Sequence, residues 1–161
     1  MHSVSYIYKI GVGPSSSHTM GPKRAAEKFL ARHQSPAKFK VTLYGSLAAT
    51  GKGHMTDKAI IDVLTKVAPT EIEWRSSEFL PFHPNAMTFY AYDAEGNEMG
   101  KRTYYSIGGG DIVEEGQTVS PRPDVYELSH ISDIKKWCVN SGRSYWEYVN
   151  ECEKPEIWEY L

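Results

Sequence analysis

Two short stretches of the sequence place a histidine among small and hydroxyl-bearing residues directly ahead of an expected helix. The first, residues 11–19, contains His18 and the hydroxyls of Ser15, Ser16, Ser17 and Thr19. The first amides of a helix have no intrahelical acceptor and lie at the positive end of its dipole, so such a start favours an anion. A substrate carboxylate or a phosphate would suit it. The competing interpretation is that the serines cap the helix and His18 faces solvent.

The second stretch, residues 51–57, repeats this arrangement with two glycines, His54, Thr56 and Asp57. It lacks the Gly-Lys-Ser/Thr ending of a phosphate-binding P-loop, which disfavours nucleotide binding. Two histidine-bearing helix starts in one chain favour a shared site over coincidence.

A third cluster, His83-Pro84-Asn85, precedes an expected hairpin, and Ser106-Ile107-Gly108-Gly109-Gly110 ends it. The Asn85 amide can both donate to and accept from an amino acid. The glycines would let a ligand approach the backbone closely. His83 by itself is better explained as a surface histidine or a hydrogen-bonded core histidine.

The elements that must position these residues follow from the hydrophobic pattern. Apolar residues at helical spacing predict helices over residues 21–33 and 59–67, with Thr56 or Asp57 as N-cap of the second and a loop over residues 50–53 before it. Alternation predicts a strand over residues 39–44, and segments 87–93 and 101–107 predict a hairpin. The fold expected is α+β: a two-layer sandwich with an antiparallel hairpin in a mixed sheet.

The chain of 161 residues is expected to form one core domain, residues 1–120, followed by a helical tail or linker, residues 121–161. Helical spacing within the tail recurs over residues 131–138 and 145–152. The tail also holds the sequence's two cysteines, Cys138 and Cys152, which form neither a disulfide framework nor a complete metal site.

Composition narrows the function classes. The net charge of −2 and the absence of a basic stripe argue against a nucleic-acid partner. No apolar run approaches the roughly 20 residues of a membrane span, and no basic region followed by an apolar stretch opens the chain. We expect a cytoplasmic protein that binds a small molecule.

Residues 3 to about 115 resemble the β domain of iron–sulfur L-serine dehydratases. Four ordered motifs carry the resemblance: Ile10–Pro22, Leu43–Leu47 with Thr50–Asp57, His83–Asn85, and Tyr104–Gly110. Within that family the β domain is similar in fold to the allosteric substrate-binding domain of some phosphoglycerate dehydrogenases, in agreement with the α+β expectation.

The resemblance implies deamination of L-serine to pyruvate and ammonia with a [4Fe–4S] cluster, one iron of which acts as Lewis acid on the departing hydroxyl. The family's cluster cysteines belong to an α domain, and a cluster needs several thiolates. We therefore expect this chain to bind no cluster alone, to be a shortened form of a single-chain enzyme, to have the α domain as partner, and to form a homodimer. His54 is expected to be the α-proton base with His18 in support, and the expected substrate-binding residues are Ser15, Ser16, Ser17, Thr19, Thr56, Asp57 and Asn85.

Two other functions remain open. The same helix starts could bind a carboxylate effector without chemistry, as a regulatory domain does. A serine hydrolase built on Ser16 or Ser17 with His18 is disfavoured, because adjacent residues seldom align a nucleophile with its base and no nucleophile elbow is present.

Overall fold

The computed structural model describes residues 1–33, 35–119 and 121–160. The chain forms two compact units. One is Gly11–Val119, and the other combines Met1–Ile10 with the residues after Val119.

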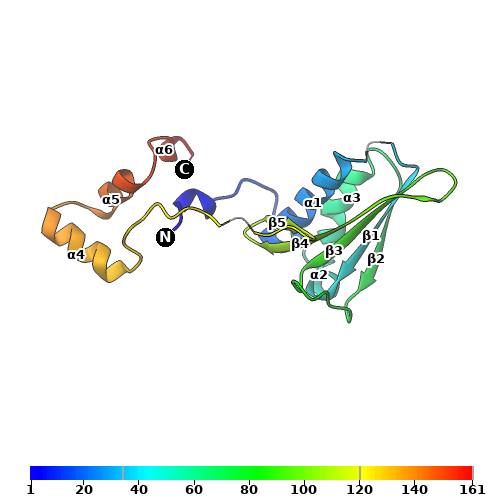
Figure 1. The fold of residues 1–161 in the computed structure, drawn as a ribbon, viewed down its shortest axis with the longest axis horizontal. Helices are drawn as coiled ribbons and strands as arrows, with labels where there is room; N and C mark the ends of the chain where they lie inside the picture. The colour runs from blue at the N-terminus through cyan, green and yellow to red at the C-terminus, as the bar shows by residue number, and fades with distance from the viewer. Residues whose placement is uncertain (34, 120, 161) are drawn as a thin grey trace. The chain divides into compact units, whose positions relative to one another are not determined.

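The unit Gly11–Val119 contains, within the described residues, a five-stranded mixed sheet of order β2-β1-β3-β4-β5 (Figure 1). Strand β1 (Lys38–Tyr44) pairs in parallel with β2 and antiparallel with β3. Strands β3, β4 and β5 continue as antiparallel neighbours. The bounds of the other strands are β2 Thr70–Arg75, β3 Ala86–Tyr92, β4 Glu98–Gly108 and β5 Asp111–Glu114.

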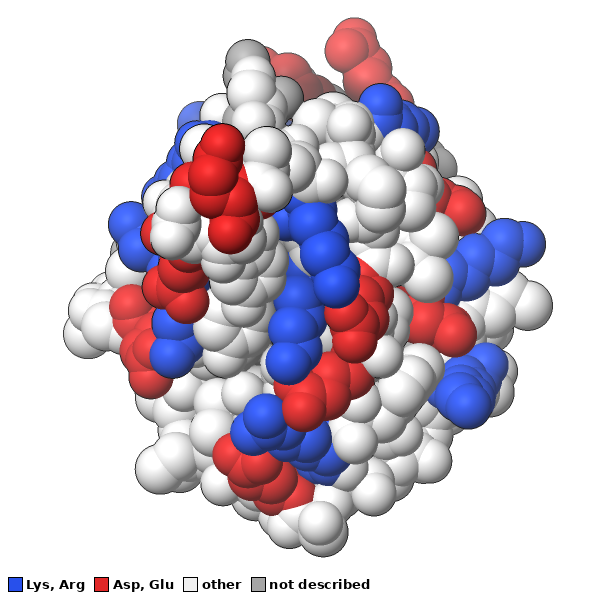
Figure 2. All heavy atoms as spheres, turned by 90° about the vertical axis from the view of Figure 1, so that its right-hand side faces the viewer, with Lys and Arg blue, Asp and Glu red and all other residues white. Residues whose placement is uncertain are grey.

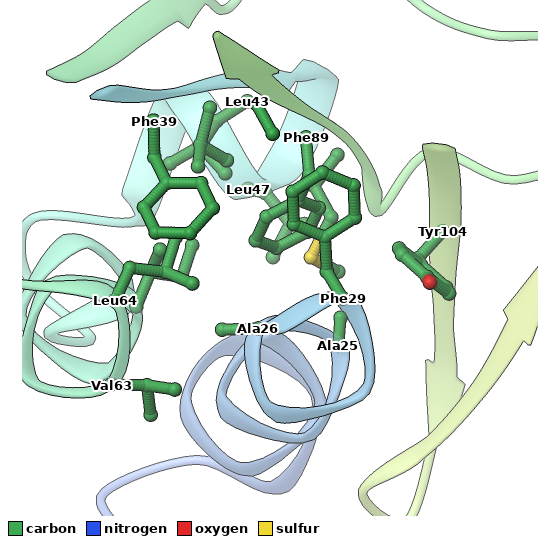
Figure 3. Close-up of a cluster of buried hydrophobic side chains, with 14 of the residues drawn as sticks. Ala25, Ala26, Phe29, Phe39, Leu43, Leu47, Val63, Leu64, Phe89 and Tyr104 are labelled. Carbon is green, nitrogen blue, oxygen red and sulfur yellow. The ribbon is translucent and has the colours of Figure 1, made fainter. Parts of the chain in front are cut away.

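Helices α1 (Gly21–Leu30) and α3 (Thr56–Leu64) pack on one face of this sheet, and the short α2 (Gly45–Thr50) follows β1 (Figure 1). Strand alternation sends Phe39, Val41 and Leu43 toward the helices, where all three are fully buried. The helices contribute their apolar stripes to the same core (Figure 3): Ala25, Ala26 and Phe29 from α1, and Ile60, Val63 and Leu64 from α3. The structure confirms the two-layer α+β sandwich with a hairpin in a mixed sheet.

Some local features differ from what the sequence predicted. Strands β2 and β5 were not predicted, and the loop expected over residues 50–53 begins one residue later, because Thr50 is the last residue of an unpredicted helix, α2. Gly45 takes a positive φ of 47° and begins α2 directly after β1 ends at Tyr44. Neither Thr56 nor Asp57 is the N-cap of α3; that position belongs to Met55, in the left-handed conformation and without a side-chain cap.

The second unit holds α4 (Ile131–Ser141), α5 (Tyr145–Cys152) and α6 (Ile157–Tyr160), with a short 3-10 turn at Val4–Tyr6. Its small core centres on Tyr126, Ile134 and Tyr148, and both cysteines pack against that core. Glu153 ties the N-terminal segment to this unit, because its carboxylate accepts from the Ser3 hydroxyl at 2.7 Å and from the Val4 amide at 2.8 Å.

On the face drawn in Figure 2, Lys and Arg side chains alternate with Asp and Glu, and no broad patch of one sign is seen there. Among the helices described, none has the length and apolar character needed to cross a bilayer.

Candidate active site

The first histidine turn lies at the start of α1. Residues Ser16–Met20 form one wide π-helical turn that leads into α1, and Ser15 caps it by accepting a hydrogen bond from the His18 amide at 3.1 Å. The first amides of such a turn have no intrahelical acceptor, and π-type turns are frequent at functional sites. The two sequence interpretations are therefore compatible: a serine caps the turn, and the turn keeps the amide-rich start that suits an anion.

The ring of His18 is held between two hydroxyls. Its Nδ1 lies 3.0 Å from Ser17 Oγ, and its Nε2 lies 3.1 Å from Ser46 Oγ. Ser46 belongs to α2, and its amide donates to the carbonyl of Pro84. Because a hydroxyl can donate or accept, this arrangement satisfies either tautomer of His18.

The ring of His54 makes a contact with the backbone of α2, because its Nδ1 lies 3.1 Å from the carbonyl oxygen of Thr50. A carbonyl oxygen only accepts, so this contact is a hydrogen bond when the proton of neutral His54 sits on Nδ1. The second nitrogen, Nε2, then carries a lone pair.

The two histidines meet. Their ring centroids lie 4.9 Å apart, with the planes inclined by 40°. Burial lowers the pKa of His18, the nearby His54 lowers it further, and a hydrogen bond with Ser46 opposes both effects. His18 therefore stays neutral to lower pH than an ordinary histidine.

Two threonines link the histidine turns to each other. The Thr19 hydroxyl donates to the carbonyl of His54 at 2.7 Å, and the Thr56 hydroxyl donates to the carbonyl of His18 at 2.5 Å. This bond explains why Thr56 does not cap α3: its hydroxyl is engaged by the other turn.

The start of α3 is less open to an anion than the sequence suggested. The Thr56 amide donates to the carbonyl of Gly51 at 2.8 Å, and the Lys58 amide donates to Asp57 Oδ1 at 2.9 Å. Two of the donors expected to be free are thus occupied within the chain. Donors of the Ser16–Met20 turn are occupied too, because the His18 amide donates to Ser15 Oγ and the Ser15 amide donates to Thr19 Oγ1.

Strands β3 and β4 bring the remaining motifs to the same turn. The Ser106 hydroxyl, fully buried, donates to the carbonyl of Ser17 at 2.7 Å, and the Ser106 amide donates to the carbonyl of Asn85 at 2.9 Å. The Asn85 side-chain amide lies 3.4 Å from the Ser106 carbonyl. His83 accepts from the Asn85 amide through Nδ1 at 3.1 Å, so its ring stabilises this loop.

Hydrogen bonds connect most of the predicted site residues, either directly or through one further residue. The two exceptions are Ser16, which is exposed, and Asp57, which is half-buried beside Thr56. Contact of any of them with a substrate stays a prediction. Sequence reasoning missed Ser46 and Ser106 as site residues, although both lie inside recognised motifs. Ser46 lies in the first turn of α2, a helix that was not predicted, and Ser106 lies near the end of β4, so neither belongs to an expected helix start.

The residues of this chain do not fit an iron–sulfur cluster. The sequence has two cysteines, both in the C-terminal unit, and no group of three or more His, Cys, Asp or Glu side chains within the described ranges could hold a metal ion. The hydrolase alternative also lacks support, because the second nitrogen of His18 meets the Ser46 hydroxyl where a triad would place a carboxylate.

The fold and the site define an α+β sandwich domain that carries a linked histidine pair at its helix starts. Comparison with known families identifies it further: residues 3–78 and 62–117 match the model of the serine dehydratase beta chain, and the chain belongs to that family.

Several L-serine dehydratases are similar to the chain. That of Streptomyces coelicolor is 39% identical over an alignment covering 70% of this chain and 34% of that protein. L-serine dehydratase 1 of Escherichia coli is 31% identical across 100% of this chain and 46% of that protein. The L-serine dehydratase of Haemophilus influenzae is 32% identical, with coverage of 88% and 41%. The chain therefore spans between a third and a half of the length of these relatives.

Proposed function

We propose that this chain is the β-domain portion of an L-serine dehydratase, which converts L-serine to pyruvate and ammonia. The family match and the names of the relatives support this substrate. The observation that carries the chemical part is the His54 contact with Thr50, because it leaves one imidazole nitrogen as an acceptor beside an anion-friendly turn.

In this proposal the serine carboxylate binds at the start of the Ser16–Met20 turn. Amides there, with the hydroxyls of Ser15, Ser16 and Ser17, supply neutral donors for a carboxylate. Asn85, which approaches the same turn through Ser106, and Asp57, beside the His54 turn, are proposed to contact the polar groups of the substrate.

His54 is the proposed base. Its Nε2 accepts the α-proton of serine and passes a proton on to the departing β-hydroxyl, which leaves as water. The resulting aminoacrylate takes up water and hydrolyses to pyruvate and ammonia. His18 lies against His54 and remains neutral to lower pH, so it can donate a hydrogen bond without adding a second positive charge to the pair.

We further propose that an α domain outside this chain holds the [4Fe–4S] cluster that the resemblance implies. The support is the length of the relatives and the lack of fit between a cluster and the residues of this chain. When bound, the cluster would supply the Lewis acid for the departing hydroxyl, while the residues of this chain would hold the carboxylate and take up the α-proton.

Replacement of His54 by Asn tests the proposal. Asn keeps a hydrogen-bond donor but cannot take up the proton, and general-base catalysis contributes about 10²–10⁴-fold. In the complete, cluster-loaded dehydratase, His54→Asn should lower kcat by that order while the cluster spectrum is unchanged. A rise in KM with kcat intact would assign His54 to binding instead.

A regulatory function remains the alternative, in which the same turn binds a carboxylate effector. The favouring observation is that the Ser16–Met20 turn suits a carboxylate whether or not His54 acts as a base. Under that function His54→Asn would alter the response to the effector and leave the basal turnover unchanged.

A further inference from the structure

The two histidine turns exchange hydrogen bonds in a reciprocal pattern. Thr19, which follows His18, donates to the carbonyl of His54, and Thr56, close after His54, donates to the carbonyl of His18. Each histidine carbonyl is therefore held by a hydroxyl from the opposite turn. We propose that Thr19 and Thr56 are positioning residues that lock the His18 and His54 rings into one rigid pair, and that they act through the histidines and not by touching substrate.

The burial of the two threonines supports a positioning role. Thr56 is 0% exposed, and Thr19 is 4% exposed although it borders a cavity that Gly13 and Met55 also line. The Thr19 hydroxyl is used twice, because its oxygen also accepts from the Ser15 amide at 3.2 Å. A buried hydroxyl with its donor and acceptor engaged inside the protein has little capacity left for a substrate.

Further hydrogen bonds hold the backbone on either side of His18. Ser15 Oγ holds the His18 amide, Thr56 holds the His18 carbonyl, and Ser106 holds the carbonyl of Ser17. The backbone that carries His18 is thus fixed at three successive polar groups. On the other side, the Thr50 carbonyl orients the His54 ring while Thr19 holds the His54 carbonyl.

Such fixing matters because the two rings lie only 4.9 Å apart. A movement of either turn changes the distance between the imidazoles and the direction in which the proposed base presents Nε2. A displacement of about 1 Å in a catalytic group can cost about 10²-fold in rate. The catalytic consequence rests on the function proposed above, but the positioning itself does not.

Thr56→Val is the most direct test, because valine keeps the shape of threonine and removes the donor. Thr56→Ser restores the hydroxyl and serves as the rescue variant. Thr103→Val is the matched control: Thr103 is also buried, at 5% exposure, and its hydroxyl pairs with that of Thr88 at 3.1 Å on the sheet.

The first readout is the titration of the His18 ring in the 161-residue chain, followed by NMR. Burial is the main cause of the low pKa of His18, and the nearby His54 lowers it further, so loosening the pair in Thr56→Val should raise that pKa part of the way toward 6.5. Thr56→Ser and Thr103→Val should titrate as the parent does. An unchanged titration in Thr56→Val, or an equal shift in Thr103→Val, would overturn the proposal.

The second readout is kinetic and uses the complete dehydratase. Thr56→Val and Thr19→Val should lower kcat by about 10- to 100-fold with KM nearly unchanged, because the base is misplaced while the carboxylate site remains. A rise in KM alone, with the His18 titration of the parent, would show substrate contact and overturn the positioning role. If Thr56→Val does not fold, Thr19→Val carries the same test from the other turn. If His54 is not the base, the proposed function fails but the expected NMR titration is unchanged. Failure of the proposed function can therefore be told apart from failure of the positioning proposal.

Discussion

At the residue scale, the two histidines differ in how their nitrogens are used. Both nitrogens of His18 meet hydroxyls, from Ser17 and Ser46, whereas one nitrogen of His54 meets a carbonyl, that of Thr50. Only the carbonyl contact of His54 selects one neutral tautomer, because a carbonyl oxygen accepts a hydrogen bond and cannot donate one. This difference is the physical basis for assigning the base to His54 and the supporting role to His18, an order that sequence position alone supported weakly.

The low pKa of His18 predicts a loss of stability in acid. Because the folded state lowers the pKa of His18 below 6.5, the unfolded chain binds the proton more tightly than the folded chain does. Well above pH 6.5 His18 is neutral in both states and has no effect on stability through its pKa. As pH drops below that value, the free energy of unfolding should fall. Urea unfolding at pH 7 and pH 5 measures this fall.

The control for this prediction is His18→Asn, which should make the stability less dependent on pH over that interval. His33 also has a lowered pKa, chiefly from burial and then from Arg102 and Arg32, so part of the dependence should remain. An unchanged pH dependence in His18→Asn would contradict the assignment.

At the element scale, the junction between the π-helical turn and α1 depends on Gly21. A Cβ at this position would lie 2.2 Å from Ser106 Oγ. Alanine normally stabilises a helix relative to glycine by about 1 kcal/mol, but here we expect Gly21→Ala to destabilise the chain by about 1–3 kcal/mol through overpacking. Thermal or urea unfolding of Gly21→Ala measures whether the free energy of unfolding falls, as expected here, or rises.

A double variant checks the cause of that loss. Ser106→Gly removes the clashing side chain, so Gly21→Ala should cost much less in a Ser106→Gly background than in the parent. Additive losses from the two changes would show that the clash is not the reason.

The elements also show how far the sequence could predict the fold. Helices α1 and α3, strand β1 and the β3–β4 hairpin have strong periodicity, and the structure confirms them. Strand β2 was missed because its apolar residues, Ile72 and Trp74, are only two, between charged neighbours. Strand β5 has four residues, and helix α2 begins at a glycine in a conformation that a sequence pattern does not display.

The candidate site was predictable in part for the same reason. The two helix starts are local patterns, so the sequence identified His18 and His54, and the structure shows that the two turns meet. The direction of each hydroxyl is a tertiary property. Consequently the reciprocal threonine bonds, and the contacts of Ser46 and Ser106, were not visible in the sequence.

At the scale of the whole molecule, the chain corresponds to between a third and a half of its relatives, and the cluster is proposed to belong to another domain. Anaerobic reconstitution of the 161-residue chain with iron and sulfide should therefore leave it colourless and without serine dehydratase activity, because its two cysteines are too few for a cluster. A brown, active product would contradict the proposal. The homodimer and the cytoplasmic location stay predictions.

The most direct test of the central claim is the exchange of the serine α-proton with solvent deuterium in the complete dehydratase. If His54 removes that proton, His54→Asn should stop the exchange together with the elimination, while the cluster spectrum remains that of the parent. Exchange at the parent rate in His54→Asn, with loss of exchange in His18→Asn, would contradict the account and assign the base to His18.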